Sequence, residues 1–291
     1  MLIDSHVHLY PPEINADPAA WAAAAGETHW ATLVTRRRRD GRAVQSFPSA
    51  DELLREMDAA GVDRAVLLGW YWLEPKSCAV QNRFYAECVR KHPSRFSAFA
   101  TLHPAAGRDA ALAEIRRARD EGLVGLGELS PHSQGYSIAD PVFEAALALA
   151  AELRFPVNLH VTCPDARAYP GHVPTPLADF VAIAQKFPAT TFVLAHWGGL
   201  LPLRADLADE VRPLKNVFYD TAASPLLYDA TVWARFLGSV DPARVLFGSD
   251  FPLNLYPARD AVPTMTTLIA EARREGVSGE IFAGNMQRVV G

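Results

Sequence analysis

Short apolar runs alternate with amphipathic stretches along the chain from about residue 50 onward. The runs are rich in β-branched and aromatic residues and end in glycine, proline or polar clusters, which is typical of strands. We therefore expect eight strands, at residues 2–9, 63–70, 96–103, 123–130, 155–162, 190–197, 216–223 and 244–251.

The stretches between these runs carry signals for helix starts and stops. Residues 49–61 begin with Ser49, have Glu52 three positions later as in a capping box, and end at Gly61. Four further amphipathic stretches predict helices, at residues 110–122, 139–153, 175–187 and 263–276.

Strands that alternate with helices pair in parallel through crossover connections, and eight such units close into a barrel. We predict an α/β fold, a (β/α)₈ TIM barrel in which residues 1–291 form a single domain. An open doubly wound sheet is the alternative. It is disfavoured because no GxGxxG motif follows the first strand.

The connection after the first predicted strand is much longer than the others. Residues 11–50 hold Trp21, Trp30 and a helical stretch around residues 18–34. A connection of this length inside a compact domain is usually functional or contacts another subunit. We expect a flap over the barrel mouth, with a homodimer contact as the alternative.

The overall charge argues against some partners. The chain carries a net charge of -5, so no global positive field favours nucleic acid or an anionic membrane. We interpret the arginine run at residues 36–39 as a solvated loop or an inter-subunit patch in preference to a phosphate site. No apolar stretch reaches the roughly 20 residues that span a bilayer, and the three cysteines are scattered. We expect a soluble, cytoplasmic protein with a small-molecule substrate.

Polar residues in the first predicted strand raise the question of chemistry. Asp4, His6 and His8 alternate along the strand, so they project to one face. Burying three such groups without partners costs a few kcal/mol each. A hydrogen-bond network or a metal ion would explain them.

Further donors close the other predicted strands, where the catalytic groups of such barrels lie. The residues at these ends that could bind a metal are His6, His8, Glu128, His160, His196 and Asp250. Such donors, converging at one end, are electrostatically costly without a cation. We therefore predict one or two divalent ions; mixed histidine and carboxylate ligation suits zinc, with manganese as the alternative.

The motifs IDSHVH, GELS, LHVT, LAHWGG, LFGSDFP and GNMQRVVG span the chain. With them the sequence resembles the amidohydrolase superfamily, in its amidohydrolase-related branch of metal-dependent hydrolases and decarboxylases. The resemblance implies that His6, His8 and His160 ligate metal, and that His196 ligates metal or acts catalytically. It implies that Asp250 ligates metal and carries protons.

Glu128 stands where many members of the superfamily carry a carbamylated lysine, and no lysine lies nearby in this chain. Its carboxylate would either bridge two cations or support a ligand or the substrate.

The ligand set leaves the reaction open. A metal-bound hydroxide that attacks a small lactone, ester or amide is our first hypothesis, with His196 and Asp250 as catalytic residues. The alternative is a metal-dependent decarboxylase of an unsaturated or aromatic acid. A nuclease, or a barrel that binds metal without turnover, is disfavoured.

Other residues are weaker candidates. We predict that His132, Trp70 and Asn254 contact the substrate, because they lie near the predicted strand ends. Asp4 and Asn158 share strand faces with His6 and His160 but lie one layer deeper. We expect both to support the metal site through buried hydrogen bonds.

Overall fold

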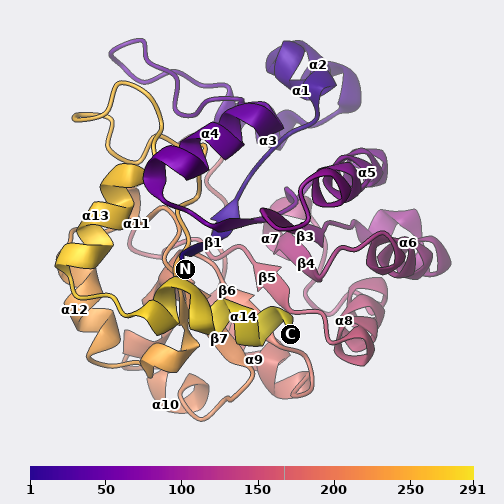
Figure 1. The fold of residues 1–291 in the computed structure, drawn as a ribbon. Coiled ribbons are helices and arrows are strands. Elements are labelled where there is room, and N and C mark those ends of the chain that lie inside the picture. The colour runs from indigo at the N-terminus through magenta and orange to yellow at the C-terminus, as the bar shows by residue number, and fades with distance from the viewer. Residues whose placement is uncertain (167) are drawn as a thin grey trace.

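Eight parallel strands form the centre of the computed structural model, which describes residues 1–166 and 168–291 (Figure 1). Neighbouring strands follow chain order, from β1 to β8. Their bounds are β1 Ile3–Val7, β2 Arg64–Leu67, β3 Phe96–Ala100, β4 Gly125–Leu129, β5 Val157–Leu159, β6 Phe192–Leu194, β7 Val217–Asp220 and β8 Val245–Leu246.

Two hydrogen bonds bring the last strand back to the first. The Ser5 N–H donates to the Phe247 carbonyl at 2.8 Å, and the Asp250 N–H donates to the His6 carbonyl at 2.9 Å. With the helices outside the strands, this arrangement confirms the predicted (β/α)₈ TIM barrel.

Helices surround the strands (Figure 1). The main ones are α4 Ala50–Ala60, α5 Pro75–Lys91, α6 Arg108–Asp120, α8 Pro141–Leu153, α9 Leu177–Lys186, α12 Thr231–Leu237, α13 Thr266–Arg274 and α14 Asn285–Val290. Shorter ones are α7 Pro131–Gln134, α10 Ala208–Val211 and α11 Ser224–Leu227. The 3-10 helices are η1 Pro104–Ala106, η2 His196–Leu203 and η3 Pro242–Arg244, and η4 Glu280–Gly284 is a short π-helix.

The start of α4 shows how local sequence sets an element boundary. The Ser49 N–H donates to the Glu52 carboxylate at 2.7 Å, and the Glu52 N–H donates to the Ser49 hydroxyl at 3.3 Å. This reciprocal pair is the predicted capping box. The helix ends at Gly61, whose φ of 71° is the left-handed conformation that glycine adopts readily.

Helix α5 was not among the predicted helices. Its inward face carries the buried polar side chains Gln81 and Asn82, which break the apolar periodicity. Both side chains form hydrogen bonds with backbone carbonyl groups. The Gln81 amide donates to the Leu9 carbonyl at 3.0 Å, and the Asn82 amide donates to the Thr101 carbonyl at 3.0 Å.

The long connection after β1 forms three short helices, α1 Pro12–Ala16, α2 Pro18–Ala25 and α3 Thr28–Val34, and α1 and α2 lie at the top of Figure 1. Trp30 is fully buried there, with its ring centroid 5.2 Å from that of Tyr10 and 5.4 Å from that of Trp72. These contacts attach the insertion to the barrel. A homodimer contact through it stays a prediction.

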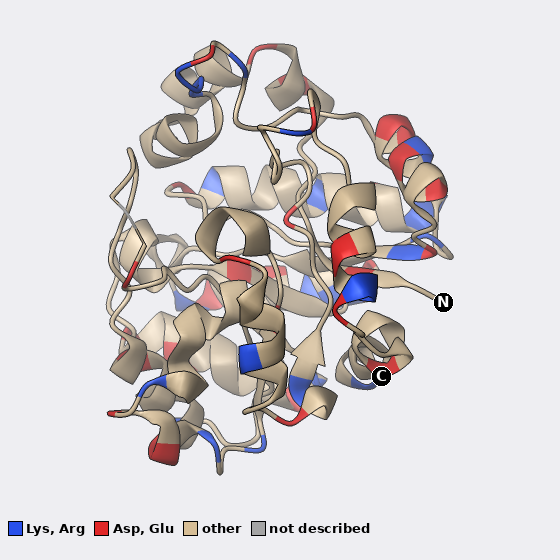
Figure 2. Ribbon diagram, turned by 90° about the vertical axis from the view of Figure 1, so that its left-hand side faces the viewer, with Lys and Arg blue, Asp and Glu red and all other residues tan. Residues whose placement is uncertain are grey.

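Lysine, arginine, aspartate and glutamate residues are interspersed along the outer elements (Figure 2). No helix in the described part of the chain is both long and apolar enough to cross a membrane.

Candidate metal centre

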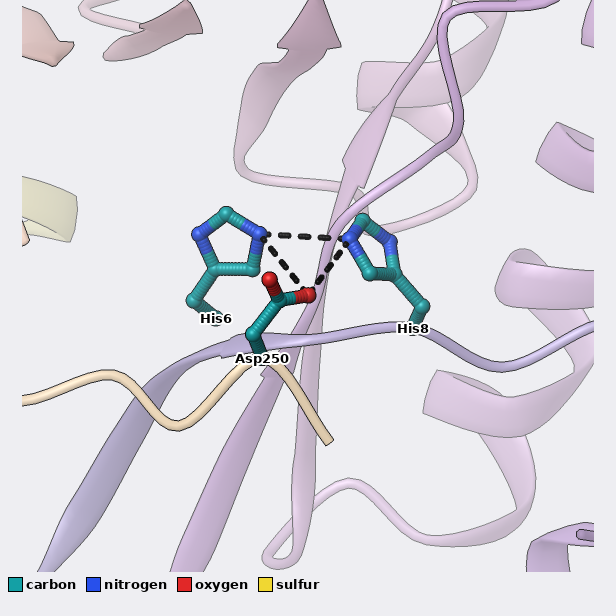
Figure 3. A group of neighbouring side chains, drawn as sticks. All are labelled: His6, His8 and Asp250. Atoms are coloured by element: carbon teal, nitrogen blue, oxygen red, sulfur yellow. Dashed lines mark hydrogen bonds and ion pairs between the residues drawn. The ribbon is translucent and has the colours of Figure 1, made fainter. Parts of the chain in front are cut away.

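His6 of β1, His8 just after this strand and Asp250 after β8 meet at the carboxyl end of the barrel (Figure 3). The Nε2 atoms of His6 and His8 lie 3.2 Å apart. Oδ1 of Asp250 lies 3.4 Å from the His8 nitrogen and 3.8 Å from the His6 nitrogen. All three residues are buried.

The other ring nitrogens of the two histidines already have partners. His6 Nδ1 lies 2.9 Å from Oδ2 of Asp220, and His8 Nδ1 lies 3.1 Å from the Leu68 carbonyl oxygen. Both partners are hydrogen-bond acceptors, so each Nδ1 atom donates and carries the ring's proton. In neutral rings the two Nε2 atoms would then have no proton, and their lone pairs would point toward each other. A positive charge between these atoms resolves the conflict.

Three further donors lie beside this group. Oε1 of Glu128 lies 2.8 Å from His160 Nδ1 and 3.4 Å from His196 Nε2. Oε2 of the same carboxylate lies 3.6 Å from His8 Nε2 and 3.8 Å from His6 Nε2. Glu128 therefore connects the two groups, and all six predicted donors converge.

The spacing and chemistry of these donors fit a divalent cation. Two ligands about 2.1 Å from one zinc ion lie roughly 3 to 3.4 Å apart, as the two Nε2 atoms do. Burial disfavours the charged imidazole, but the neighbouring carboxylates, Asp220 first, outweigh it and raise the pKa of His6 to about 10. The site thus favours positive charge even at neutral pH.

In the second group, which consists of Glu128, His160 and His196, neighbouring charges lower the pKa of a carboxylate. Burial raises the pKa of Glu128, but the neighbouring imidazoles, His160 first, outweigh it and hold the pKa well below its usual range. Glu128 is therefore an anion at neutral pH and available to a cation.

The backbone at two of these donors is unusual. His196 has a φ of 59° and Asp250 a φ of 69°, the left-handed region that side chains other than glycine rarely adopt. Each amide is held there: the His196 N–H donates to Oδ1 of Asp220 at 3.0 Å, and the Asp250 N–H donates to the His6 carbonyl. Such backbone strain concentrates at functional sites.

Asp220, at the end of β7, was not recognised from the sequence. Its buried carboxylate accepts from the His6 ring, from the His196 N–H and from the Asn158 amide at 3.1 Å. The signal was present in NVFYDTAA, where Asp220 is the one acidic residue and closes the seventh predicted strand.

The two residues expected to support the site do form buried hydrogen bonds. Asp4 accepts from the backbone N–H groups of His6 at 3.1 Å and Ser249 at 2.9 Å, and Asn158 donates to Asp220. Asp4 therefore holds the backbone of β1 and the loop after β8, whereas Asp220 orients the His6 ring.

The donors open onto a cavity, and the predicted substrate contacts differ in how they lie toward it. Trp70 and Tyr71 line it with stacked rings, 4.4 Å between centroids. His132 instead faces Asp179, 2.8 Å from its carboxylate, and the Asn254 amide donates to the Asp260 carbonyl at 3.1 Å. Neither is among the described lining residues, so their contact with substrate stays a prediction that this placement does not support.

The insertion supplies the opposite wall of the cavity. Among its lining residues are His29, Leu33, Val34, Arg36, Arg38, Val44 and Gln45. The segment therefore borders the candidate site, and its role as a flap stays a prediction.

Two curated proteins match: decarboxylase orsB of Emericella nidulans, 26% identical over 208 residues, and 6-methylsalicylic acid decarboxylase acuB of Aspergillus aculeatus, 24% identical over 330 residues. The first match covers 55% of this chain and 59% of that protein's length; the second covers 98% and 94%.

Solved structures share the fold. 5-Carboxyvanillate decarboxylase from Sphingomonas paucimobilis has a TM-score of 0.73 at 18% identity, with 99% of this chain and 98% of that chain covered. A dihydroxybenzoic acid decarboxylase from Polaromonas sp. JS666, with bound manganese and the inhibitor 2-nitroresorcinol, has a TM-score of 0.67 at 19% identity, with 99% and 96% covered. The family model described as amidohydrolase matches residues 3–285, and the chain therefore belongs to the amidohydrolase family.

Proposed function

We propose that this enzyme is a divalent-metal-dependent decarboxylase of a small aromatic carboxylic acid. The sequence alone favoured a hydrolase, with decarboxylation as the alternative. The curated relatives are both named decarboxylases, which supports the alternative.

The observation that carries the proposal is the position of the donors beside an aromatic wall. Tyr71 stacks on Trp70, and its ring centroid lies 4.9 Å from that of His160. A flat ring fits against such a surface by stacking. Its acidic substituent would then lie against the group formed by His6, His8 and Asp250.

The residues present would hold one ion through His6, His8 and Asp250, with Oε2 of Glu128 as the next donor. His160 and His196, on the other side of Glu128, either hold a second ion or contact the substrate. Mixed histidine and carboxylate donors accept both zinc and manganese. When bound, the ion would neutralise the substrate's anionic oxygens and orient them.

Proton transfer falls to Asp250 in this proposal. Oδ1 of Asp250 faces His6 and His8, and Oδ2 lies 4.0 Å from His196 Nδ1, so the carboxylate borders both groups. The carboxylate takes up a proton from solvent and delivers it to the ring carbon that carries the substrate's carboxylate. The bond to that carboxylate then breaks, its electron pair returns to the ring, and carbon dioxide leaves.

A substrate panel tests the proposal. The metal-loaded protein is incubated with hydroxybenzoic acids, including 6-methylsalicylic acid, and with simple lactones, and released carbon dioxide is measured. We expect one carbon dioxide for each acid consumed, and none from protein treated with a chelator. Lactone opening without release of carbon dioxide from any acid would support the hydrolase hypothesis and overturn the proposal.

A further inference from the structure

The arginine run in the insertion is part of a β-hairpin over residues 36–45. Arg37 and Ala43 form an antiparallel bridge. The Arg38 N–H donates to the Arg42 carbonyl at 2.8 Å, and the Val44 N–H donates to the Arg36 carbonyl at 3.3 Å. The run therefore forms the first strand and the start of the turn of this hairpin, and the expected inter-subunit patch stays a prediction.

Extended backbone sends alternate side chains to opposite faces, and Arg36, Arg37 and Arg38 follow this rule before the turn begins at Arg39. Arg36 and Arg38 line the cavity and are half-buried. Arg37 and Arg39 are exposed and are not among the described lining residues. Two of the four arginines thus line the cavity onto which the candidate metal centre opens.

The hairpin is attached to the loop that carries Asp250. Gln45 bridges Leu253 in antiparallel fashion, and the Asn254 N–H donates to the Val44 carbonyl at 2.9 Å. The Arg38 guanidinium also donates to the Asn254 carbonyl at 2.9 Å. The cationic face is therefore fixed relative to the metal centre.

Neither cavity-facing arginine forms an ion pair with a carboxylate of the described residues. Arg36 donates to the Leu33 carbonyl at 3.1 Å and lies over the ring of Tyr169. Nε of Arg38 is buried without a hydrogen-bond partner. By contrast, the neighbouring Arg42 pairs with Asp40. Two like charges on one wall, one with an unused donor, call for an anion.

Other unused donors line the same cavity. Nε2 of Gln45 and Nε1 of Trp70 are both buried without a partner in the described structure. A buried donor without a partner is destabilising, and a ligand oxygen would satisfy it. This wall is therefore suited to an oxygen-rich group.

We propose that Arg36 and Arg38 form a second anion-binding subsite, so that this enzyme selects aromatic acids with a carboxylate in addition to the one at the metal centre. The inference rests on the proposed function, which places the reacting carboxylate beside His6, His8 and Asp250. The acidic end of the cavity then holds the cation, and its basic end holds the second carboxylate. A planar guanidinium suits this role because it binds a carboxylate through two parallel hydrogen bonds.

The test compares two ligands that differ by one group. Salicylate and 4-hydroxyisophthalate, which is salicylate with a second carboxylate, are titrated into manganese-loaded protein, and tryptophan fluorescence gives each Kd. We expect wild type to bind the dicarboxylate about tenfold or more tightly than the monocarboxylate. Arg36→Gln and Arg38→Gln should each remove most of this preference and leave salicylate binding unchanged.

The hairpin supplies its own matched control. Arg39→Gln removes an equal charge from the exposed face of the same segment, so it should keep the preference. Equal binding of both ligands by wild type, or an equal loss of preference in Arg39→Gln, would overturn the subsite. Because the titration reports binding whether or not the ligand reacts, a retained preference with no carbon dioxide from any acid would contradict the decarboxylase proposal alone.

Discussion

The His6 imidazole and the Asp220 carboxylate form a fully buried pair, with Nδ1 of the ring 2.9 Å from Oδ2 of the aspartate. The pair joins β1 to β7, and it directs Nε2 of His6 toward His8 and Asp250. The orientation of one predicted ligand therefore depends on a residue that lies outside the donor set.

Replacement of Asp220 should weaken metal binding without removing a ligand. Asp220→Asn loses the charge that favours the donating Nδ1 tautomer of His6, so we expect about 10- to 100-fold lower metal affinity. Competition titration with a chromogenic chelator measures this. Asp209→Asn, at a fully exposed carboxylate, is the control and should bind metal as wild type does. Unchanged affinity in Asp220→Asn would contradict the role of the pair.

Metal affinity should rise with pH. The pKa of His6 is raised from 6.5 to about 10 in the folded, metal-free protein, so at pH 7 the site holds a proton that a cation must displace. We expect affinity to increase about tenfold per pH unit between about pH 7 and 9. Calorimetry in buffers of different ionisation enthalpy should show about one proton released per ion bound. No proton release at pH 7 would show that His6 is already neutral.

The raised pKa of His6 also makes the stability of the metal-free protein depend on pH, in the direction opposite to metal affinity. A raised pKa stabilises the fold through the bound proton, and this contribution is fully present below about pH 6.5 and lost as pH rises through about 10. Metal-free protein should therefore unfold more readily at alkaline pH, and metal should restore its stability.

The insertion should be an integral part of the cavity wall. Trp30→Ala removes a fully buried ring that contacts Tyr10 and Trp72, so we expect a loss of about 3 to 5 kcal/mol in the free energy of unfolding or local release of residues 11–50. Urea unfolding and limited proteolysis distinguish these outcomes. Trp30→Phe should lose clearly less. An equally stable, protease-resistant Trp30→Ala protein would show that the insertion does not depend on this cluster.

Much of the barrel could be predicted from sequence because strand-like and helix-like periods alternate along the chain. The five predicted helical stretches correspond to α4, α6, α8, α9 and α13. Helix α5 was missed because Gln81 and Asn82 place amides on its buried face, where periodicity expects apolar side chains.

The convergence of the six donors followed from barrel topology, but their supporting contacts did not. The ring of His6 is oriented by a residue 214 positions away, and strand alternation alone suggested the nearer Asp4. The two faces of the arginine run likewise depend on hairpin register, which composition does not reveal.

The most direct test of the central claim follows isotopes from solvent into product. The metal-loaded protein is incubated with an accepted acid in D₂O, and separately in H₂¹⁸O, and the product is analysed by mass spectrometry. We predict one deuterium on the ring carbon that lost its carboxylate, no ¹⁸O in the aromatic product, and loss of turnover by about 100-fold or more in a folded Asp250→Asn variant. Incorporation of ¹⁸O into a newly formed acid, without deuterium on carbon, would contradict decarboxylation and show that the enzyme is a hydrolase.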